Sequence, residues 1–242
     1  MLKMLIIKTG CTIDAIRTDY GDFEDWVRDG LGYADAEVQT VAVYLGESLP
    51  ELNENNAISG IVITGSNAMV TDREIWSEKT AEWLRQAIEA NYPVLGICYG
   101  HQLIAHAMGG RVDYNPKGYE IGVIQIELMA EAKNDLLFNH LSSSLMAYSV
   151  HAQTVIDLPN HAVILARNAH DNHQAFRIGQ CCWGVQFHPE FNAEITRRYI
   201  HAREISFAEY GYSMEQLLRN VTDCPESQQV LRRFGEWVRQ GA

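Results

Sequence analysis

The sequence has few basic residues and no long hydrophobic run. Among its 242 residues, Lys and Arg total 19 against 31 Asp and Glu, a formal net charge of −12 at pH 7. This excess of acidic side chains repels a phosphate backbone, so we expect no nucleic-acid partner. No stretch approaches the roughly 18 uninterrupted apolar residues of a membrane helix. The short apolar run between Lys3 and Lys8 is also far below the roughly 7–15 residues of a signal-peptide core, so we expect no membrane association.

Cysteine is scarce, and no two cysteines are spaced as C-x-x-C. An odd number of five suits neither a disulfide framework nor a structural zinc site, and a reducing cytoplasm is the expected location. The segment from His170 to His173 contains turn-forming Asp and Asn between two strand patterns, which favours a solvated hairpin loop over a metal pair. We therefore expect no metal and no cofactor. The cysteines are Cys11, Cys98, Cys181, Cys182 and Cys224.

Strand and helix patterns alternate through the first half of the chain, with no repeat and no low-complexity tract. This alternation is typical of an α/β fold with a parallel sheet. The clearest helix is expected from about Arg73 to Ala90, where Thr71 and Glu74 have the spacing of a capping box. The expected strands are Lys3–Lys8, Val38–Leu45, Ile61–Thr64 and Pro93–Ile97.

The second half of the sequence has shorter extended runs and then a helical tail. The runs predict largely antiparallel strands that complete the same sheet. We therefore predict a mixed, mostly parallel open sheet flanked by helices over residues 1–203, with a short helical extension over residues 204–242 packed on it. The extended runs are Val123–Leu128, Leu145–Leu158, Val163–Arg167, Gln174–Ile178 and Cys182–Phe187.

The strongest chemical signal is a cysteine at a predicted strand-to-helix junction. Cys98 follows a buried-strand pattern and lies between Gly96 and Gly100, which is the G-x-C-x-G form of a nucleophile elbow. A residue in so sharp a turn adopts a strained backbone, and flanking glycines remove the Cβ atoms that would collide there. We therefore expect the Cys98 thiol to be held out at the carboxyl end of the sheet as a nucleophile.

A nucleophilic thiol needs a base, and His188-Pro-Glu190 supplies one together with a residue to orient it. Pro189 favours an extended conformation for His188, and residues two apart on an extended chain project to the same side. Glu190 can then bind one imidazole nitrogen while the other faces the thiol. The motifs together predict a triad of Cys98, His188 and Glu190.

The elbow G-I-C-Y-G-H-Q and the segment G-V-Q-F-H-P-E resemble the class I, triad-type glutamine amidotransferases over nearly all of residues 1–200. Within that family the sequence looks like the amidotransferase domain of GMP synthase and like the related γ-glutamyl peptidases. The resemblance implies a flavodoxin-like fold and hydrolysis of the glutamine side-chain amide, through a γ-glutamyl thioester, to glutamate and ammonia. It also implies that Cys98 is the nucleophile, His188 the base and then the acid, and Glu190 the group that orients His188.

The resemblance further assigns the oxyanion hole and the substrate contacts. The backbone N–H groups of Tyr99 and Ser66 match the oxyanion hole, although the Gly-Gly-Pro turn of the family reads Thr64-Gly65-Ser66-Asn67 here. Gln102 matches the elbow glutamine that helps hold the substrate, and Gly65 belongs to the same pocket. The main chain of Ser149 and Val150 matches the strand that binds the α-amino and α-carboxylate groups, with Gln153 where many relatives have aspartate. By position, Lys117 and Glu120 are expected at the pocket rim.

The leaving group and the partner stay open at this level. The sequence has no G-x-x-x-x-G-K-[ST] phosphate loop, so it is not a whole GMP synthase and would need a separate acceptor-activating synthase subunit to use the ammonia. The leading hypothesis is a glutaminase that acts on glutamine. The alternatives are a γ-glutamyl peptidase acting on glutathione-like compounds, and a catalytically idle regulatory or binding subunit.

Overall fold

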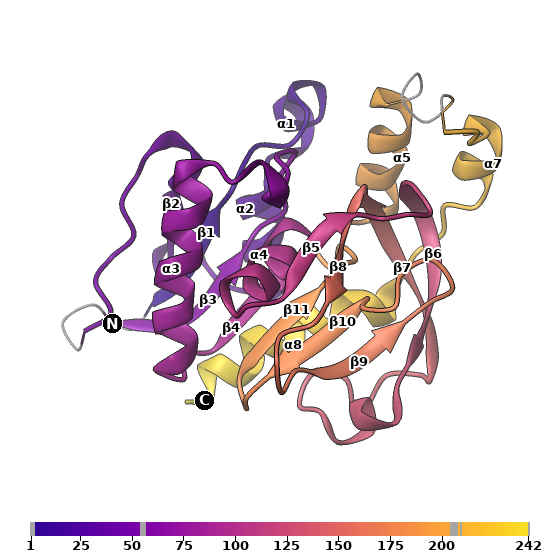
Figure 1. Cartoon of the computed structure of the whole chain (residues 1–242). Helices are drawn as coiled ribbons and strands as arrows, with labels where there is room; N and C mark the ends of the chain where they lie inside the picture. Colours follow the sequence, from indigo (N-terminus) through magenta and orange to yellow (C-terminus); the bar gives the residue numbers. More distant parts are fainter. Residues whose placement is uncertain (1–2, 54–56, 204–207, 209, 242) are drawn as a thin grey trace.

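A nine-stranded sheet forms the centre of the computed structural model, which describes residues 3–53, 57–203, 208 and 210–241. The strand order is β2-β1-β3-β4-β11-β10-β9-β6-β7 (Figure 1). The five strands from β2 to β11 in this order pair in parallel: β1 (Lys3–Lys8), β2 (Val38–Ala42), β3 (Ile58–Ile63), β4 (Val94–Ile97) and β11 (Cys182–Val185).

The remaining strands of the large sheet pair antiparallel and extend it on the β11 side. They are β10 (Ala175–Ile178), β9 (Val163–Arg167), β6 (Glu120–Leu128) and β7 (Ser144–His151). The expected α/β architecture is therefore confirmed. One detail was wrong: Leu145–Leu158 is two strands, because after His151 the chain leaves the large sheet and β8 (Gln153–Asp157) pairs with β5 (Arg111–Tyr114) in a separate two-stranded sheet.

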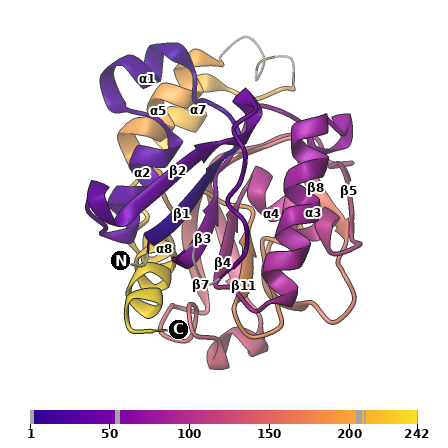
Figure 2. The ribbon, with the colours of Figure 1, turned by 90° about the vertical axis from the view of Figure 1, so that its left-hand side faces the viewer.

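Helices cover both faces of the large sheet (Figure 2). On one face, α3 (Ile75–Glu89) and α4 (Tyr99–Ala107) pack their apolar sides on the parallel strands, and on the other face α2 (Phe23–Leu31) lies beside α8 (Pro225–Arg239). Each face buries its own apolar cluster, and this burial is the main stabilising term of such a layered fold. Three further helices lie together at one end of the sheet: α1 (Asp14–Tyr20), α5 (Ala193–Ala202) and α7 (Met214–Arg219).

The tail helix α8 packs into the core instead of lying on its surface. Its residues Val230, Leu231, Phe234 and Val238 are buried in one cluster with strand residues such as Trp183. The division of the chain at residue 203 stays a prediction, since residues 204–207 lie outside the described ranges.

The capping box predicted for α3 does not form. The helix begins at Ile75 with Glu74 as N-cap and no side-chain cap hydrogen bond, because Thr71 lies in a preceding 3-10 turn, Val70–Asp72. The Thr71 hydroxyl instead accepts a hydrogen bond of 2.5 Å from the Gln153 side chain. A second 3-10 turn, Val43–Leu45, likewise replaces the end of the strand predicted over Val38–Leu45. None of the helices in the described ranges is long and apolar enough to cross a membrane.

Candidate active site

Cys98 lies at the junction of β4 and α4 in a conformation that few side chains adopt. Its φ is 50° and its ψ is −99°, and its N–H donates to the Val185 carbonyl of β11 at 2.8 Å. The flanking positions must be glycine, because a Cβ atom at either one would collide with neighbouring backbone. A Cβ on Gly96 would lie 2.4 Å from the Gly100 carbonyl oxygen, and one on Gly100 would lie 2.6 Å from the Ile63 carbonyl oxygen. The elbow predicted from sequence is thus present, with its strain supported by close backbone packing.

The His188 imidazole and the Glu190 carboxylate form a buried pair beside this elbow. His188 Nδ1 donates to Glu190 Oε1 at 2.7 Å, and the imidazole stacks on the Phe191 ring with 4.1 Å between centroids. His188 Nε2 is buried and has no hydrogen-bond partner among the described residues. Burial alone would lower the pKa of His188. The effects of Glu190 and Cys98 are larger and opposite, so the pKa is raised to about 10.

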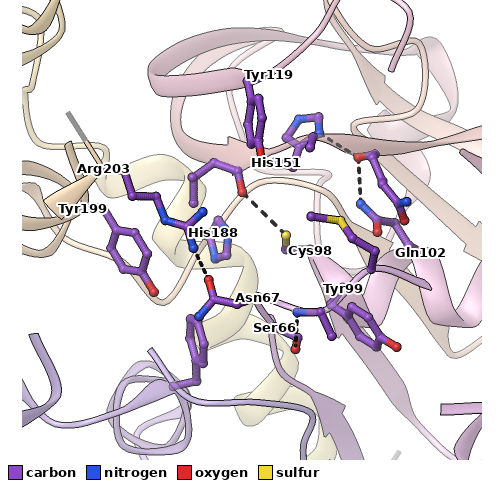
Figure 3. A pocket seen from close by; sticks show the side chains of 16 residues that line it. Ser66, Asn67, Cys98, Tyr99, Gln102, Tyr119, His151, His188, Tyr199 and Arg203 are labelled. Carbon is purple, nitrogen blue, oxygen red and sulfur yellow. Dashed lines mark hydrogen bonds between the residues drawn. The ribbon is translucent and has the colours of Figure 1, made fainter. Parts of the chain in front are cut away.

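Cys98 and His188 line one cavity of about 550 Å³, counted with the solvent at its mouth (Figure 3). Ser66, Tyr99, Gln102 and Val150 line it as well. The structure therefore brings together residues from segments up to about 120 positions apart in the chain. The Val150 carbonyl oxygen lies 3.9 Å from Cys98 Sγ, so the end of β7 approaches the thiol directly.

The turn after β3 is held by its serine rather than by glycine and proline. Ser66 Oγ donates to the Thr9 carbonyl at 2.8 Å and accepts from the Ala68 N–H at 3.1 Å. Among the described residues, neither the Ser66 N–H nor the Tyr99 N–H donates a hydrogen bond. The role of these two N–H groups as an oxyanion hole stays a prediction, and the serine ties the turn to Thr9, which directly follows β1.

Two other predicted substrate residues lie behind the cavity wall. A Cβ on Gly65 would lie 3.2 Å from His188 Cε1, so this glycine lets the turn approach the imidazole. Ser149 is buried, with its hydroxyl 3.3 Å from Glu120 Oε2. The roles of both residues stay predictions.

The expected rim positions of Lys117 and Glu120 were wrong. Neither lines the cavity. The Lys117 ammonium donates to the Ala169 carbonyl at 2.6 Å, and the Glu120 side chain is buried against His151. The register of β6 with β7 pairs Glu120 with His151, which turns the carboxylate inward.

The segment from His170 to His173 lies in the hairpin connection between β9 and β10, as expected, but it is only partly exposed to solvent. Asp171 is buried and accepts a hydrogen bond from Thr154 of β8, and His173 Nδ1 donates to the Val155 carbonyl at 2.7 Å. The loop is packed down because its polar groups find partners on the small sheet. In the described part of the chain, no group of three or more His, Cys, Asp or Glu is placed to hold a metal ion.

Sequence reasoning missed several residues of the cavity wall. His151, Tyr119 and Arg203 line it, and Arg203 donates to Asn67 in the turn beside Ser66 (Figure 3). Among the described residues, Arg203 is the only Lys or Arg that lines the cavity. No local motif marks these residues, because each reaches the cavity through the packing of a different element. Cys11 lies outside the cavity wall, with its sulfur 2.8 Å from the Tyr44 hydroxyl.

A doubly wound sheet with a strained cysteine at a strand end and a His-Glu pair beside it defines the class of protein. The family model for class I glutamine amidotransferases matches residues 17–206. The chain therefore belongs to the class I glutamine amidotransferase family.

Two curated relatives illustrate the range of this family. Gamma-glutamyl peptidase 3 of Arabidopsis thaliana is 28% identical over 190 residues, 76% of this chain and 75% of the peptidase. GMP synthase of Aeropyrum pernix is 33% identical over 146 residues, 60% of this chain but 26% of the synthase. A solved glutamine amidotransferase from Thermotoga maritima superposes with a TM-score of 0.76 at 21% identity, covering 98% of both chains, which shows the shared fold.

Proposed function

We propose that this chain hydrolyses γ-glutamyl amides with Cys98 as the nucleophile, His188 as the base and acid, and Glu190 as the residue that orients His188. The observation that carries the proposal is the strained Cys98 in one cavity with the buried His188–Glu190 pair. An imidazole with a carboxylate on Nδ1 and an Nε2 that no described residue binds is arranged to hold the thiol proton of Cys98.

The reaction proceeds in two half-reactions. The Cys98 sulfur attacks the γ-carbonyl carbon with its proton held on His188 Nε2, and the N–H groups of Ser66 and Tyr99 stabilise the oxyanion. The C–N bond then breaks, His188 gives its proton to the leaving nitrogen, and a γ-glutamyl thioester remains on Cys98. Water gives one proton to His188 Nε2 and attacks this thioester, and the C–S bond breaks to release glutamate, which leaves the Cys98 sulfur and the protonated His188 as at the start.

The glutamyl half of the substrate is assigned to Gln102, Gly65 and the main chain of Ser149 and Val150. The Gln102 side-chain nitrogen already donates to the Gln153 carbonyl at 2.8 Å and to Gln186 Oε1 at 2.9 Å. Its oxygen accepts no hydrogen bond from the described residues, so it is available to the substrate amino group.

Glutamine is the first candidate substrate, with ammonia as the leaving group. Ammonia released here would serve a separate synthase subunit that activates the acceptor, as the similarity to a GMP synthase suggests. A γ-glutamyl peptide is the second candidate. It is favoured by Arg203 in the cavity wall, whose guanidinium would pair with a carboxylate on the leaving group, and by the similar length of the peptidase relative.

The test is to incubate the purified protein separately with glutamine and with glutathione, measuring glutamate, ammonia and the released dipeptide. Glutamate with ammonia supports the first candidate, and glutamate with the dipeptide supports the second. A kcat/KM for glutathione well above that for glutamine would make the protein a peptidase. Release of glutamate from neither substrate would overturn the proposed function.

A further inference from the structure

A buried ion pair that the proposed reaction does not use reaches the wall of the cavity. His151 at the end of β7 and Glu120 at the start of β6 face each other across the ladder, with His151 Nε2 3.0 Å from Glu120 Oε2. Their side chains are 1% and 7% exposed. His151 lines the cavity and Glu120 does not. Burial of two charges is costly, so a pair kept in this position calls for a physical reason.

The surrounding hydrogen bonds define the charge of Glu120. Its two oxygens accept from Gln174 Nε2 at 2.6 Å, from Asn168 Nδ2 at 2.7 Å and from the Ser149 hydroxyl at 3.3 Å. All these neighbours donate, which favours the ionised carboxylate. Burial alone would raise the pKa of Glu120, but His151 and these donors lower it below its usual value.

His151 is bonded at both ring nitrogens to groups that accept. Its Nδ1 lies 2.9 Å from the Gln153 carbonyl oxygen, which has no proton to give, and its Nε2 faces the Glu120 carboxylate. Both nitrogens must therefore carry hydrogen, which makes the ring an imidazolium. Burial lowers the pKa of His151, but Glu120 raises it above its usual value overall.

The same Gln153 carbonyl oxygen also accepts from Gln102 Nε2 at 2.8 Å (Figure 3). A backbone carbonyl cannot exchange its acceptor for a donor, so it determines which way the Gln102 amide faces. Rotating that amide by half a turn would place its oxygen against the carbonyl oxygen. The Gln102 oxygen is thereby kept free of protein partners, on a side chain that lines the cavity.

We propose that Glu120 and His151 are positioning residues that hold the Gln153 carbonyl and, through it, present the Gln102 oxygen to the amino group of a γ-glutamyl substrate. The proposal rests on the proposed function for the identity of that substrate. If His151 loses a proton, the remaining hydrogen stays on Nε2 toward the charged Glu120 carboxylate, so the Nδ1 lone pair faces the Gln153 carbonyl oxygen and pushes away the carbonyl that Gln102 uses. The effect reaches substrate binding without any contact between Glu120 and the substrate.

The first experiment compares Glu120→Gln with Asp135→Asn. Asp135 is a matched control because its buried carboxylate binds Arg177 Nε at 2.9 Å and the Trp183 indole, and none of the three lines the cavity. Glu120→Gln removes the charged partner of His151. We therefore expect its KM for the glutamyl substrate to rise by roughly tenfold or more, with kcat little changed. Alkylation of Cys98 by iodoacetamide, which does not use Gln102, should keep its wild-type rate.

Three results of this comparison would overturn the proposal. One is a wild-type KM in Glu120→Gln. Another is an equal loss of KM, kcat and Cys98 alkylation, which would make the pair merely structural. The third is the same rise of KM in Asp135→Asn.

The second experiment needs neither a variant nor turnover. Nitrogen NMR of the wild-type protein labelled at histidine should show both ring nitrogens of His151 protonated at neutral pH, and a neutral ring would overturn the proposal. If the wild-type protein turns over neither glutamine nor glutathione, the proposed function fails, while the NMR result still decides the charge of the pair.

Discussion

Cys98 combines a strained backbone with the proposed role of nucleophile. Its φ of 50° is a backbone angle that L-residues rarely adopt, and its ψ of −99° falls outside the left-handed helical region. Residues in such conformations cost on the order of 1–3 kcal/mol and persist only where the surrounding structure holds them. Here the approach of Gly96 and Gly100 to neighbouring backbone provides that support.

We predict that Cys98→Ala and Cys98→Gly both keep the fold. Both variants should lose turnover, because no other thiol lines the cavity in the described structure. The glycine variant should be the more stable by about 1 kcal/mol, the reverse of the usual order, since glycine adopts positive φ without strain. Urea denaturation and glutamate release measure the two effects. Near-wild-type turnover by Cys98→Ala would refute the role of Cys98.

We predict graded losses for the two residues beside Cys98. In the proposed reaction His188 moves a proton in each half-reaction, a role worth roughly 10²–10⁴-fold, so His188→Ala should reduce kcat by about that factor. Glu190→Gln should cost less, because it removes the group that orients the imidazole but leaves Nε2 in place. Steady-state kinetics with glutamine or glutathione check the order. Negligible effects from both variants would leave Cys98 without a base.

The raised pKa of His188 predicts a pH-dependent stability. The folded protein holds the imidazolium proton up to a pKa of about 10, against an ordinary 6.5, so the pair stabilises the fold fully below pH 6.5 and loses this contribution as the pH rises to 10. The difference in unfolding free energy between wild type and Glu190→Gln should therefore shrink across that window. Urea titrations at several pH values measure it, and a difference that grows with pH would contradict the assigned charge.

At the scale of elements, the close fit of α4 against β3 fixes the position of the elbow. Gly100 lies in the first turn of α4, and a Cβ there would be 2.6 Å from the Ile63 carbonyl oxygen and 2.8 Å from the Ile63 side chain. A displaced helix start would also move the Tyr99 N–H.

We therefore predict that Gly100→Ala destabilises the fold by about 1–3 kcal/mol and also lowers kcat. Gly179→Ala is the control: Gly179 has φ 58° in the turn between β10 and β11 with no atom within 4 Å of an added Cβ. It should cost about 1 kcal/mol and leave kcat unchanged. Thermal unfolding and kinetics of both variants test this, and full activity in Gly100→Ala would show that the helix start tolerates a shift.

At the scale of the whole molecule, the C-terminal helix belongs to the core that supports the sheet. The Phe234 ring of α8 is fully buried and lies 6.2 Å from the Trp183 ring of β11, edge to face. The same strand leads directly into the segment that carries His188. Loss of α8 packing would therefore disturb the position of His188 as well as the core.

We predict that Phe234→Ala destabilises the protein by roughly 3–5 kcal/mol, as expected for a fully buried aromatic side chain. Leu217→Ala on α7 should cost clearly less, because Leu217 is only partly buried. Urea denaturation of the two variants makes the comparison. Similar, small effects would indicate that the tail is dispensable to the core.

The sequence by itself determined the features that depend on nearby residues. Glycines at fixed spacing around Cys98 and the His188-Pro-Glu190 segment act over a few positions, so their local geometry could be derived before the structure was known. The alternating fold class followed from periodicity in the same way, and β1 and β9 have the bounds expected for them.

Only the tertiary structure decided how distant polar groups pair. Glu120 and His151 are 31 positions apart, and Thr71 and Gln153 are 82 apart. A one-residue change of strand register would turn Glu120 to the other face, and the sequence pattern does not specify that register. For this reason Glu120 was expected at the rim but does not line the cavity, and Thr71 was expected to cap α3 but binds Gln153 of β8. The register of β6 with β7 places the His151–Glu120 pair beside the cavity.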